Sequence, residues 1–241
     1  MLSSSLHSQL HSQLLGCSEK HVVLLPNHKE VKVHVEALPS IQQLIDDARR
    51  AGFQLRVASG FRSFERQLLI WNNKCGGKRP VLDHDGYTVN LQRLSSIEKV
   101  YAILRWSALP GASRHHWGTD IDIYDAAVIS KDYSLQLHPD EYTGKGLFAP
   151  MMEWLAEYLA LENSPRFVRP YSEDKNGVAP ELWHLSYRPI ANRYEQHLSL
   201  VLLDEFLSSL LPMGKKSDAM IEEQSVVLDH LPAIYQRFIQ L

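Results

Sequence analysis

The sequence predicts an α+β protein with a small, mostly antiparallel sheet and helices packed against one side of that sheet. Two observations lead to this class. Short stretches in which polar and apolar residues alternate are separated by longer segments whose apolar residues recur at helical spacing. From Ile190 onward only the helical period is present, which predicts a helical C-terminal extension.

The first elements follow from periodicity and from turn residues. Residues 31–37 (VKVHVEA) alternate and predict a strand, and residues 53–58 (FQLRVA) predict a second strand. A helix is expected between them, from Pro39 to Gly52, because apolar side chains recur there at helical spacing. A further helix is expected over residues 63–74, before a Cys-Gly-Gly break.

The middle of the chain contains a clear helix start and an alternating strand. Residues 95–107 open with the capping box S-x-x-E and predict a helix. Residues 119–124 (TDIDIY) predict a strand on which Asp120 and Asp122 point to the same face. Another helix is expected over residues 149–161, where apolar residues again recur at helical spacing.

The other segments are loops, short strands and C-terminal helices. Exposed loops are expected at residues 76–94, as a flap beside a substrate, and at residues 130–148. Short strands and then helices are expected at 167–170, 182–188, 190–211 and 219–240. The chain is thus predicted to divide into a polar lead-in, a central domain and a helical extension, with the bounds 1–20, 21–195 and 196–241.

Length and charge narrow the class of protein. A chain of 241 residues suffices for one domain with an appendage, and a net charge of −3 without a basic stripe indicates no nucleic-acid partner. No apolar run is long enough for a transmembrane helix, and the N-terminus lacks the charged and apolar regions of a signal peptide. We therefore expect a cytoplasmic location, while a periplasmic one and the oligomeric state stay open. The two cysteines form no CxxC pair and are expected to be free thiols.

Three short segments place charged or metal-ligating residues beside turns or on short strands. A catalytic zinc ion takes three protein ligands from His, Asp or Glu and keeps one position open. His115 precedes a turn at Gly118, and Asp122 lies on the strand that follows, so the turn can bring both side chains to one point. His184 comes from a later strand and is the third predicted ligand. The segments are SGFRSFERQ (59–67), SRHHWGTDID (113–122) and ELWH (181–184).

The residues around this predicted site indicate peptidase chemistry. Glu181, three residues before His184, is placed to act as a general base on a metal-activated water molecule. Arg62 can stabilise an oxyanion or bind a substrate carboxylate, and Gln67 can bond to peptide or carboxylate groups. Ser113 can place a hydroxyl beside His115. The chain has no HExxH motif, so a helix-based zincin is excluded.

Taken together, the three segments resemble the zinc D-alanyl-D-alanine carboxypeptidases of the VanY and VanX type. The resemblance covers about residues 53–190 and rests on S-x-H-x-x-G-x-x-x-D followed by E-x-W-H. It implies a Hedgehog/DD-peptidase-like fold, one catalytic zinc ion and substrates derived from peptidoglycan. By the same resemblance the family's ligands match His115, Asp122 and His184, and its base matches Glu181.

Further matches concern substrate contacts. The family's arginine and glutamine are similar to Arg62 and Gln67, and the serine of its second motif matches Ser113. Asp120 is a departure, because the commonest family form has a small apolar residue there. It shares a strand face with Asp122 and could tune the metal or contact substrate. We therefore expect Ser113, Gln67 and Asp120 to bind substrate.

The predicted activity is the removal of a terminal D-amino acid from a peptidoglycan stem peptide. An L,D-carboxypeptidase, a D-Ala-D-Ala dipeptidase and a peptidoglycan endopeptidase would use the same zinc chemistry. Only the depth and closure of the pocket separate these activities. A non-catalytic zinc-containing binding domain is the alternative from another class. Such a domain would normally lack the base or a ligand, and here Glu181 and all three ligands are present.

Overall fold

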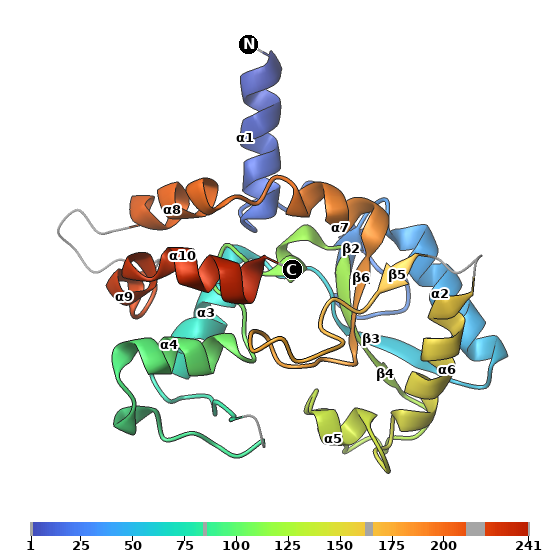
Figure 1. Ribbon diagram of the computed structural model, residues 1–241. Helices are drawn as coiled ribbons and strands as arrows, with labels where there is room; N and C mark the ends of the chain where they lie inside the picture. The colour runs from blue at the N-terminus through green and yellow to red at the C-terminus, as the bar shows by residue number, and fades with distance from the viewer. Residues whose placement is uncertain (1, 84–85, 162–165, 211–219, 241) are drawn as a thin grey trace.

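The centre of the protein is a four-stranded antiparallel sheet (Figure 1). The computed structural model describes residues 2–83, 86–161, 166–210 and 220–240. Within these residues the predicted α+β class with a small antiparallel sheet is confirmed. In sheet order the strands are β3 (Leu55–Ser59), β4 (Asp120–Asp125), β6 (His184–Tyr187) and β5 (Phe167–Val168).

The register of the sheet brings the three polar segments side by side. In the pairing of β4 with β6, Asp122 lies opposite His184 and Asp120 lies opposite Ser186. A bulge near the end of β3 places Ser59 opposite Asp122. The start of the first segment, the strand of the second and the end of the third therefore meet at one part of the sheet.

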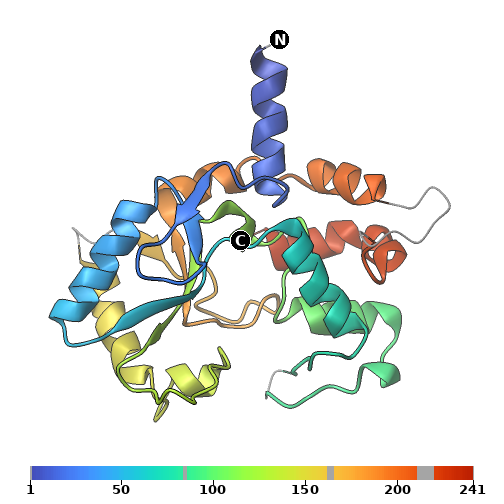
Figure 2. The same cartoon turned by 180° about the vertical axis from the view of Figure 1, so that it is seen from behind.

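Two helices cover one face of the sheet (Figures 1 and 2). They are α2 (Leu38–Arg50) and α6 (Ala149–Ala160). Ile121 and Ile123 of β4 are fully buried in the apolar cluster that these helices share with the sheet. Because side chains alternate along a strand, Asp120 and Asp122 point to the opposite face, away from this core. The alternation predicted for β4 is thus used to separate an apolar layer from a polar one.

The second core lies between the middle helices and the C-terminal ones, which Figure 1 shows next to each other. Trp71, Leu203 and Ile234 are all fully buried in it. The predicted division of the chain at residue 195 stays a prediction, but the extension packs into the same core as the middle of the chain. The helices involved are α3 (Phe64–Cys75), α4 (Ser96–Leu104), α8 (Leu200–Ser209), α9 (Gln224–Asp229), α10 (Leu231–Ile234) and the π-helical turn η3 (Tyr235–Ile239).

Shorter elements complete the described structure. The helix α1 stands out from the body at the top of Figures 1 and 2, and α5 lies at the bottom of both views. These elements are α1 (Leu2–Leu14), β1 (Val22–Leu24), β2 (Lys32–His34), η1 (Leu91–Arg93), η2 (Arg114–Trp117), α5 (Pro139–Tyr142) and α7 (Arg188–Glu195).

The N-terminal part of the polar lead-in is a helix whose C-terminal end is anchored. Residues 2–14 form α1, and its C-terminal end is anchored in the core by Leu14, which is fully buried, and by Leu15. The amide of Phe64 also donates to the carbonyl of Gly16 at 2.9 Å. These apolar anchors are too few to give a periodic signal in a polar segment.

The long C-terminal helices are broken where local chemistry ends them. The helix expected over 190–211 is split into α7 and α8, because Ser199 caps α8 by accepting from the Leu202 amide at 3.1 Å. In the last predicted helix, α9 and α10 are separate, and Pro232 in the first turn of α10 has no amide hydrogen to donate. The capping box at Ser95 is present as predicted.

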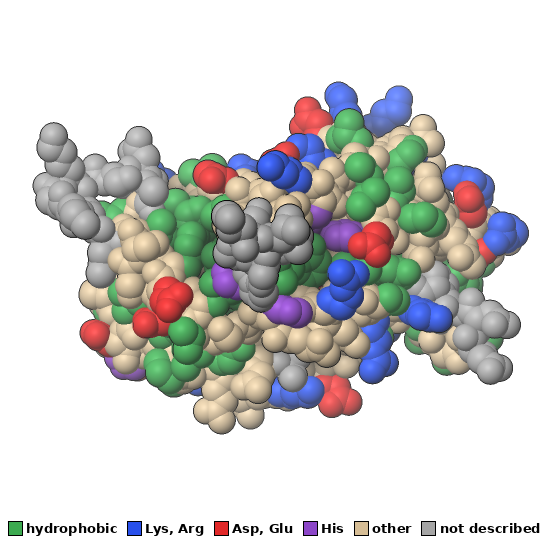
Figure 3. Space-filling view, turned by 90° about the horizontal axis from the view of Figure 1, so that it is seen from above, with side chains coloured by type: hydrophobic (Ala, Val, Ile, Leu, Met, Phe, Trp, Pro, Cys, Tyr) green, Lys and Arg blue, Asp and Glu red, His purple; other side chains and the backbone are tan. Residues whose placement is uncertain are grey.

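Three features of the structure concern the cysteines, the helices and the surface charge. Cys17 and Cys75 both lie in the described chain and neither forms a disulfide. Within the described residues no helix combines the length and apolarity that a membrane span requires. On the face seen in Figure 3, Lys and Arg side chains lie among Asp and Glu side chains, so its described residues form no continuous basic stripe.

The turn that joins His115 to β4 predicts a measurable loss of stability. Gly118 has φ +68°, and an added Cβ would lie 2.6 Å from Val22 and 2.8 Å from the amide nitrogen of His34. Gly52 also has a positive φ, +95°, but an added Cβ would meet no atom within 4 Å. We expect Gly52→Ala to cost about 1 kcal/mol of unfolding free energy and Gly118→Ala at least about 2 kcal/mol, because only the latter adds a clash to the backbone strain. Urea denaturation measures both, and equal losses would contradict this account of the turn.

Candidate metal centre and active site

The three predicted metal ligands meet at one buried point. His115 comes from η2, Asp122 from β4 and His184 from β6, and their ligand atoms all lie within 4.8 Å of one another. All three side chains are buried, with exposed fractions of 8% or less. The turn at Gly118 and the pairing of β4 with β6 produce this convergence, as the sequence argument required.

Hydrogen bonds on the far side of each ring fix which nitrogen faces this point. His115 Nδ1 lies 2.8 Å from the carbonyl oxygen of Gly60 and must donate to it. In the neutral ring His115 Nε2 then carries the lone pair, and this nitrogen lies 3.3 Å from Asp122 Oδ2. His184 Nε2 lies 2.9 Å from Asp120 Oδ1, so it donates there, and Nδ1 lies 3.3 Å from Asp122 Oδ1.

The donors present fit a zinc ion. Asp122 Oδ1 and His184 Nδ1 are buried and have no hydrogen-bond partner among the described residues. Buried polar atoms are rarely left without a partner, because the loss of their hydration is costly. Two imidazoles and one carboxylate form a common set of protein ligands for a catalytic zinc ion. Their shared point therefore calls for a cation, and its chemistry suits zinc.

The electrostatics of the site point to the same need for positive charge. Burial alone would raise the pKa of Asp122, but His115 and His184 hold it well below its usual range. Burial alone would lower the pKa of His184, but the carboxylates of Asp120, Asp122 and Glu181 close to its ring raise it well above the usual value. A metal bound at Nδ1 would require this nitrogen to be deprotonated.

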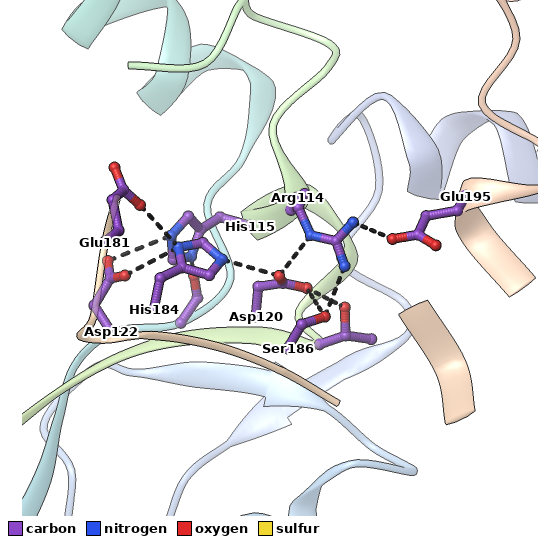
Figure 4. A network of polar contacts seen from close by, with 10 residues as sticks. Arg114, His115, Asp120, Asp122, Glu181, His184, Ser186 and Glu195 are labelled. Carbon is purple, nitrogen blue, oxygen red and sulfur yellow. Dashed lines mark hydrogen bonds and ion pairs between the residues drawn. The ribbon is translucent and has the colours of Figure 1, made fainter. Parts of the chain in front are cut away.

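Asp120 lies on the side of the His184 ring that faces away from Asp122 and Glu181 (Figure 4). Its carboxylate is completely buried and accepts four bonds: from His184 at 2.9 Å, Arg114 at 2.8 Å, Thr119 at 2.7 Å and Ser186 at 3.0 Å. It is not among the residues that line the cavity. The expectation that Asp120 contacts substrate does not fit this position. We propose instead the other role considered for it, that of orienting a metal ligand.

The charge of Asp120 is matched by Arg114, a residue that sequence analysis missed. The Arg114 guanidinium donates to Ser186 Oγ at 2.7 Å and pairs with Glu195 (Figure 4). It also lies over the indole ring of Trp117, 4.7 Å from the ring centre. Burial acts to lower the pKa of Arg114, but the nearby Asp120 raises it above its usual value, so this cation stays charged. The only sequence signal was its place between Ser113 and His115.

Glu181 lies beside the metal point on the cavity side. Its Oε2 is 3.3 Å from His184 Nδ1, and its side chain is 15% exposed. The Glu181 amide donates to the carbonyl of Tyr171 at 2.8 Å, which ties the end of the preceding loop. The Tyr171 ring in turn lies edge-on to the His184 ring, with centroids 5.1 Å apart, and no sequence motif pointed to it.

Arg62 lines the cavity, whereas Gln67 lies outside the cavity lining and bonds to Arg62. The Arg62 guanidinium donates to Gln67 Oε1 at 2.8 Å and to Ser59 Oγ at 3.1 Å. Gln67 is fully buried, donates to the carbonyl of Ala108 at 2.6 Å and does not line the cavity. Its predicted contact with substrate is therefore not supported, and its position suits the orientation of Arg62.

Ser113 does line the cavity, as expected for a substrate-binding residue. Its side chain is 1% exposed, and its Oγ has no hydrogen-bond partner in the described structure. A buried hydroxyl without a partner is poised to bond to a ligand that enters the cavity. Of the three predicted substrate-binding residues, Ser113 is the one whose position agrees with that role.

A cavity of about 830 Å³ joins these residues. Arg79 and Leu82 of the loop at 76–94 line it, as predicted for a flap, and the loop at 130–148 contributes His138. Lys74, at the end of α3, also faces this cavity, although its place in a helical pattern gave no sign of it. The metal point thus lies in a cavity large enough for a short peptide.

Comparison with known proteins identifies relatives of this chain. Residues 30–190 match the family described as VanY: D-alanyl-D-alanine carboxypeptidase. An uncharacterized protein of Haemophilus influenzae is 44% identical over 98 residues, which is 40% of this chain and 67% of that protein. A D-alanyl-D-alanine carboxypeptidase of Enterococcus faecalis is 30% identical over 183 residues, which is 74% of this chain and 56% of that enzyme.

A solved structure has the same fold. VanYB in complex with D-alanine-D-alanine is 26% identical, with 80% of this chain and 90% of that chain covered and a TM-score of 0.50. The match extends the similarity from sequence motifs to the arrangement of sheet and helices. The family match begins at residue 30 and ends at residue 190, so the C-terminal helices lie outside it.

Removal of the Asp120 charge is expected to weaken zinc binding. In Asp120→Asn the ring of His184 loses its anionic partner, and loss of such an outer partner typically lowers metal affinity about 10- to 100-fold. Competition with a chromophoric chelator measures the affinity. Glu195→Gln is the matched control, because it removes the other carboxylate of Arg114 without touching His184, and we expect nearly unchanged affinity. Wild-type zinc affinity in Asp120→Asn would rule out this orienting role.

Proposed function

We propose that this chain, which belongs to the VanY family of D-alanyl-D-alanine carboxypeptidases, is a zinc-dependent carboxypeptidase. Its proposed substrates are peptidoglycan stem peptides, from which it would remove the terminal D-amino acid. The observation that carries the proposal is the convergence of His115, Asp122 and His184 with Glu181 beside them in one cavity. The D-alanine-D-alanine bound by VanYB supports a substrate of this class.

In this proposal Glu181 moves the protons of the reaction. When bound, zinc supplies a Lewis acid that polarises the scissile carbonyl and lowers the pKa of a water molecule. Glu181 takes a proton from that water as its oxygen forms a bond to the carbonyl carbon. The same carboxyl then gives the proton to the leaving nitrogen as the C–N bond breaks. Its side chain, 15% exposed and facing the cavity, can reach both positions in turn.

Arg62 is proposed to stabilise the negative charge that develops on the carbonyl oxygen. Its guanidinium is held in place by Gln67 and Ser59, so the donor is already oriented when substrate arrives. The desolvation that lowers the pKa of Arg62 is opposed by Asp122 and Glu181, and the group stays cationic. Ser113 is proposed to donate to the substrate beside the metal ligand His115.

An unpaired cation favours a carboxypeptidase over an endopeptidase. Lys74 lines the cavity, and its Nζ contacts the carbonyl of Trp106 at 3.5 Å. In the described chain it forms no ion pair with a carboxylate. A half-buried ammonium without such a partner suits a substrate with a free carboxylate. A peptide that continues past the scissile bond would not present that charge there.

Substitution of Glu181 tests the proposed base. In Glu181→Gln we expect kcat for a stem pentapeptide to fall about 10²- to 10⁴-fold, because the amide cannot accept the proton. Bound zinc should stay at the wild-type level, since Glu181 is not a ligand. Glu173→Gln, on the exposed part of the same loop, is the control and should keep full activity. Full turnover by Glu181→Gln would refute the assignment.

Lys74 predicts a pH dependence that is specific to free carboxylates. Burial lowers the pKa of Lys74 to about 8, so the ammonium is present below that pH and is lost as pH rises through it. We therefore expect kcat/KM for a pentapeptide acid to decline above pH 8. Lys74→Arg should keep its charge and move this decline to higher pH.

An amidated substrate and a control variant test whether Lys74 binds the substrate carboxylate. Lys74→Ala should raise KM for the pentapeptide acid but not for its C-terminal amide, while Lys78→Ala, on the exposed turn after α3, should change neither. Equal effects of Lys74→Ala on acid and amide would show that Lys74 does not bind the carboxylate.

A further inference from the structure

The end of the chain reaches the active-site cavity although it lies outside the family match. After α10 the helix widens into the π-helical turn η3, Tyr235–Ile239. Phe238 and Ile239 of this turn line the same cavity as Glu181 and His184. In the view of Figure 1, α10 and the turn after it extend from the side of the second core toward the sheet. π-Helical turns are rare and are found frequently at functional sites.

This turn contacts the loop at residues 172–181, which we call the Glu181 loop. Arg237 Nε donates to the carbonyl of Asn176 at 2.5 Å. A Cβ added at Gly177 would lie 2.2 Å from the carbonyl oxygen of Arg237. The two backbones are therefore in direct contact at a position where only glycine fits.

Arg105, the residue directly after α4, also holds the Glu181 loop. Arg105 Nη1 donates to Asp174 Oδ1 at 2.8 Å and to the carbonyl of Gly177 at 3.0 Å, and Arg105 also pairs with Asp174 through Nη2. The Ala179 amide donates to the Arg105 carbonyl at 2.8 Å. The loop is thus bonded to α4 and η3 at adjacent residues.

The turn itself is firmly attached. Tyr235 donates its hydroxyl hydrogen to the carbonyl of Leu198 at 2.5 Å, and Ile234 is fully buried. The Phe238 ring packs on Tyr101 of α4 with centroids 5.5 Å apart, and the Arg237 guanidinium lies over the Tyr101 ring at 5.1 Å. η3 can therefore act as a fixed support for the loop.

We infer that η3 is part of the active site: it fixes the Glu181 loop and forms one wall of the substrate cavity. The role of Glu181 itself rests on the proposed function above. The loop contains no helix or strand, so the position of its last residue depends on such supports. Arg237 is a positioning residue here, because it acts on catalysis only through the loop.

Hydrogen exchange tests the support independently of catalysis. Arg237→Ala removes the bond to Asn176 and the stacking on Tyr101, and the residue is exposed, so no core cavity results. We expect faster amide exchange in residues 174–181 by mass spectrometry and unchanged exchange in α2. Arg193→Ala, which removes an exposed arginine paired at 3.7 Å with Glu36, is the control and should alter neither. Unchanged exchange in residues 174–181 of Arg237→Ala would overturn the inference.

Kinetics add a readout that a purely structural role would not move. Misplacement of a catalytic group by about 1 Å can cost up to about 100-fold in rate. For Arg237→Ala we expect about a tenfold fall in kcat, with KM and zinc affinity near wild type, and partial recovery in Arg237→Lys, which keeps the cation over Tyr101. Faster exchange without any loss of kcat would refute the positioning role. Wild-type activity of Glu181→Gln would instead refute the proposed function while the exchange result still decides the support.

A second variant tests the wall. Ile239→Trp places a larger side chain inside the cavity, and Gln236→Trp places the same side chain on the exposed side of η3. We expect Ile239→Trp to raise KM for a pentapeptide severalfold, with normal zinc affinity and normal exchange in the Glu181 loop. Gln236→Trp should leave KM unchanged. Equal KM values for the two variants would show that Ile239 does not bound the substrate site.

Discussion

The hydrogen bond from His184 to Asp120 is the interaction on which the rest of the site depends. It fixes the ring at 2.9 Å and turns Nδ1 toward Asp122 and Glu181. A buried carboxylate is tolerated only when its charge is met, and Arg114, Thr119 and Ser186 complete its bonds. Burial would raise the pKa of Asp120, but Arg114 and His184 hold it below its usual range. One fully bonded anion thus orients the His184 ring.

From this centre the polar layer extends in two directions. Toward the cavity, the ligand atoms of His115, Asp122 and His184 lie within 4.8 Å of one another, and Glu181 and Arg62 line the same cavity. On the side away from the cavity, the Arg114 guanidinium also forms an ion pair with Glu195 on α7. The sheet makes both possible, because the alternation of β4 puts Ile121 and Ile123 into the helix layer and Asp120 and Asp122 into this network. The polar site and the apolar core are consequences of the same strand.

The parts of the site that could be predicted from the sequence are those fixed by local spacing. His115 and Asp122 are joined by one turn, and His184 lies in a short motif beside Glu181. The contacts of His184 with Asp122 and Asp120 depend on the pairing of β4 with β6, and no pattern in the sequence specifies that register. Arg114 lies close to Asp120 along the chain, but nothing in its segment marks it as the partner of this carboxylate. Gln67 was expected to contact substrate, although it lies behind Arg62, because a helical pattern does not show what each face of the helix packs against. Lys74 and η3 reach the cavity only through the packing of the second core.

The proposed function requires one zinc ion, held at this point, for removal of the terminal D-alanine from a stem peptide. Zinc can be titrated into the metal-free protein while mass spectrometry follows D-alanine release from a pentapeptide. We expect no release without metal and a rate that rises linearly and levels off at one zinc ion per chain. Release by the metal-free protein, or a different cleavage product at one equivalent of zinc, would refute the proposed function.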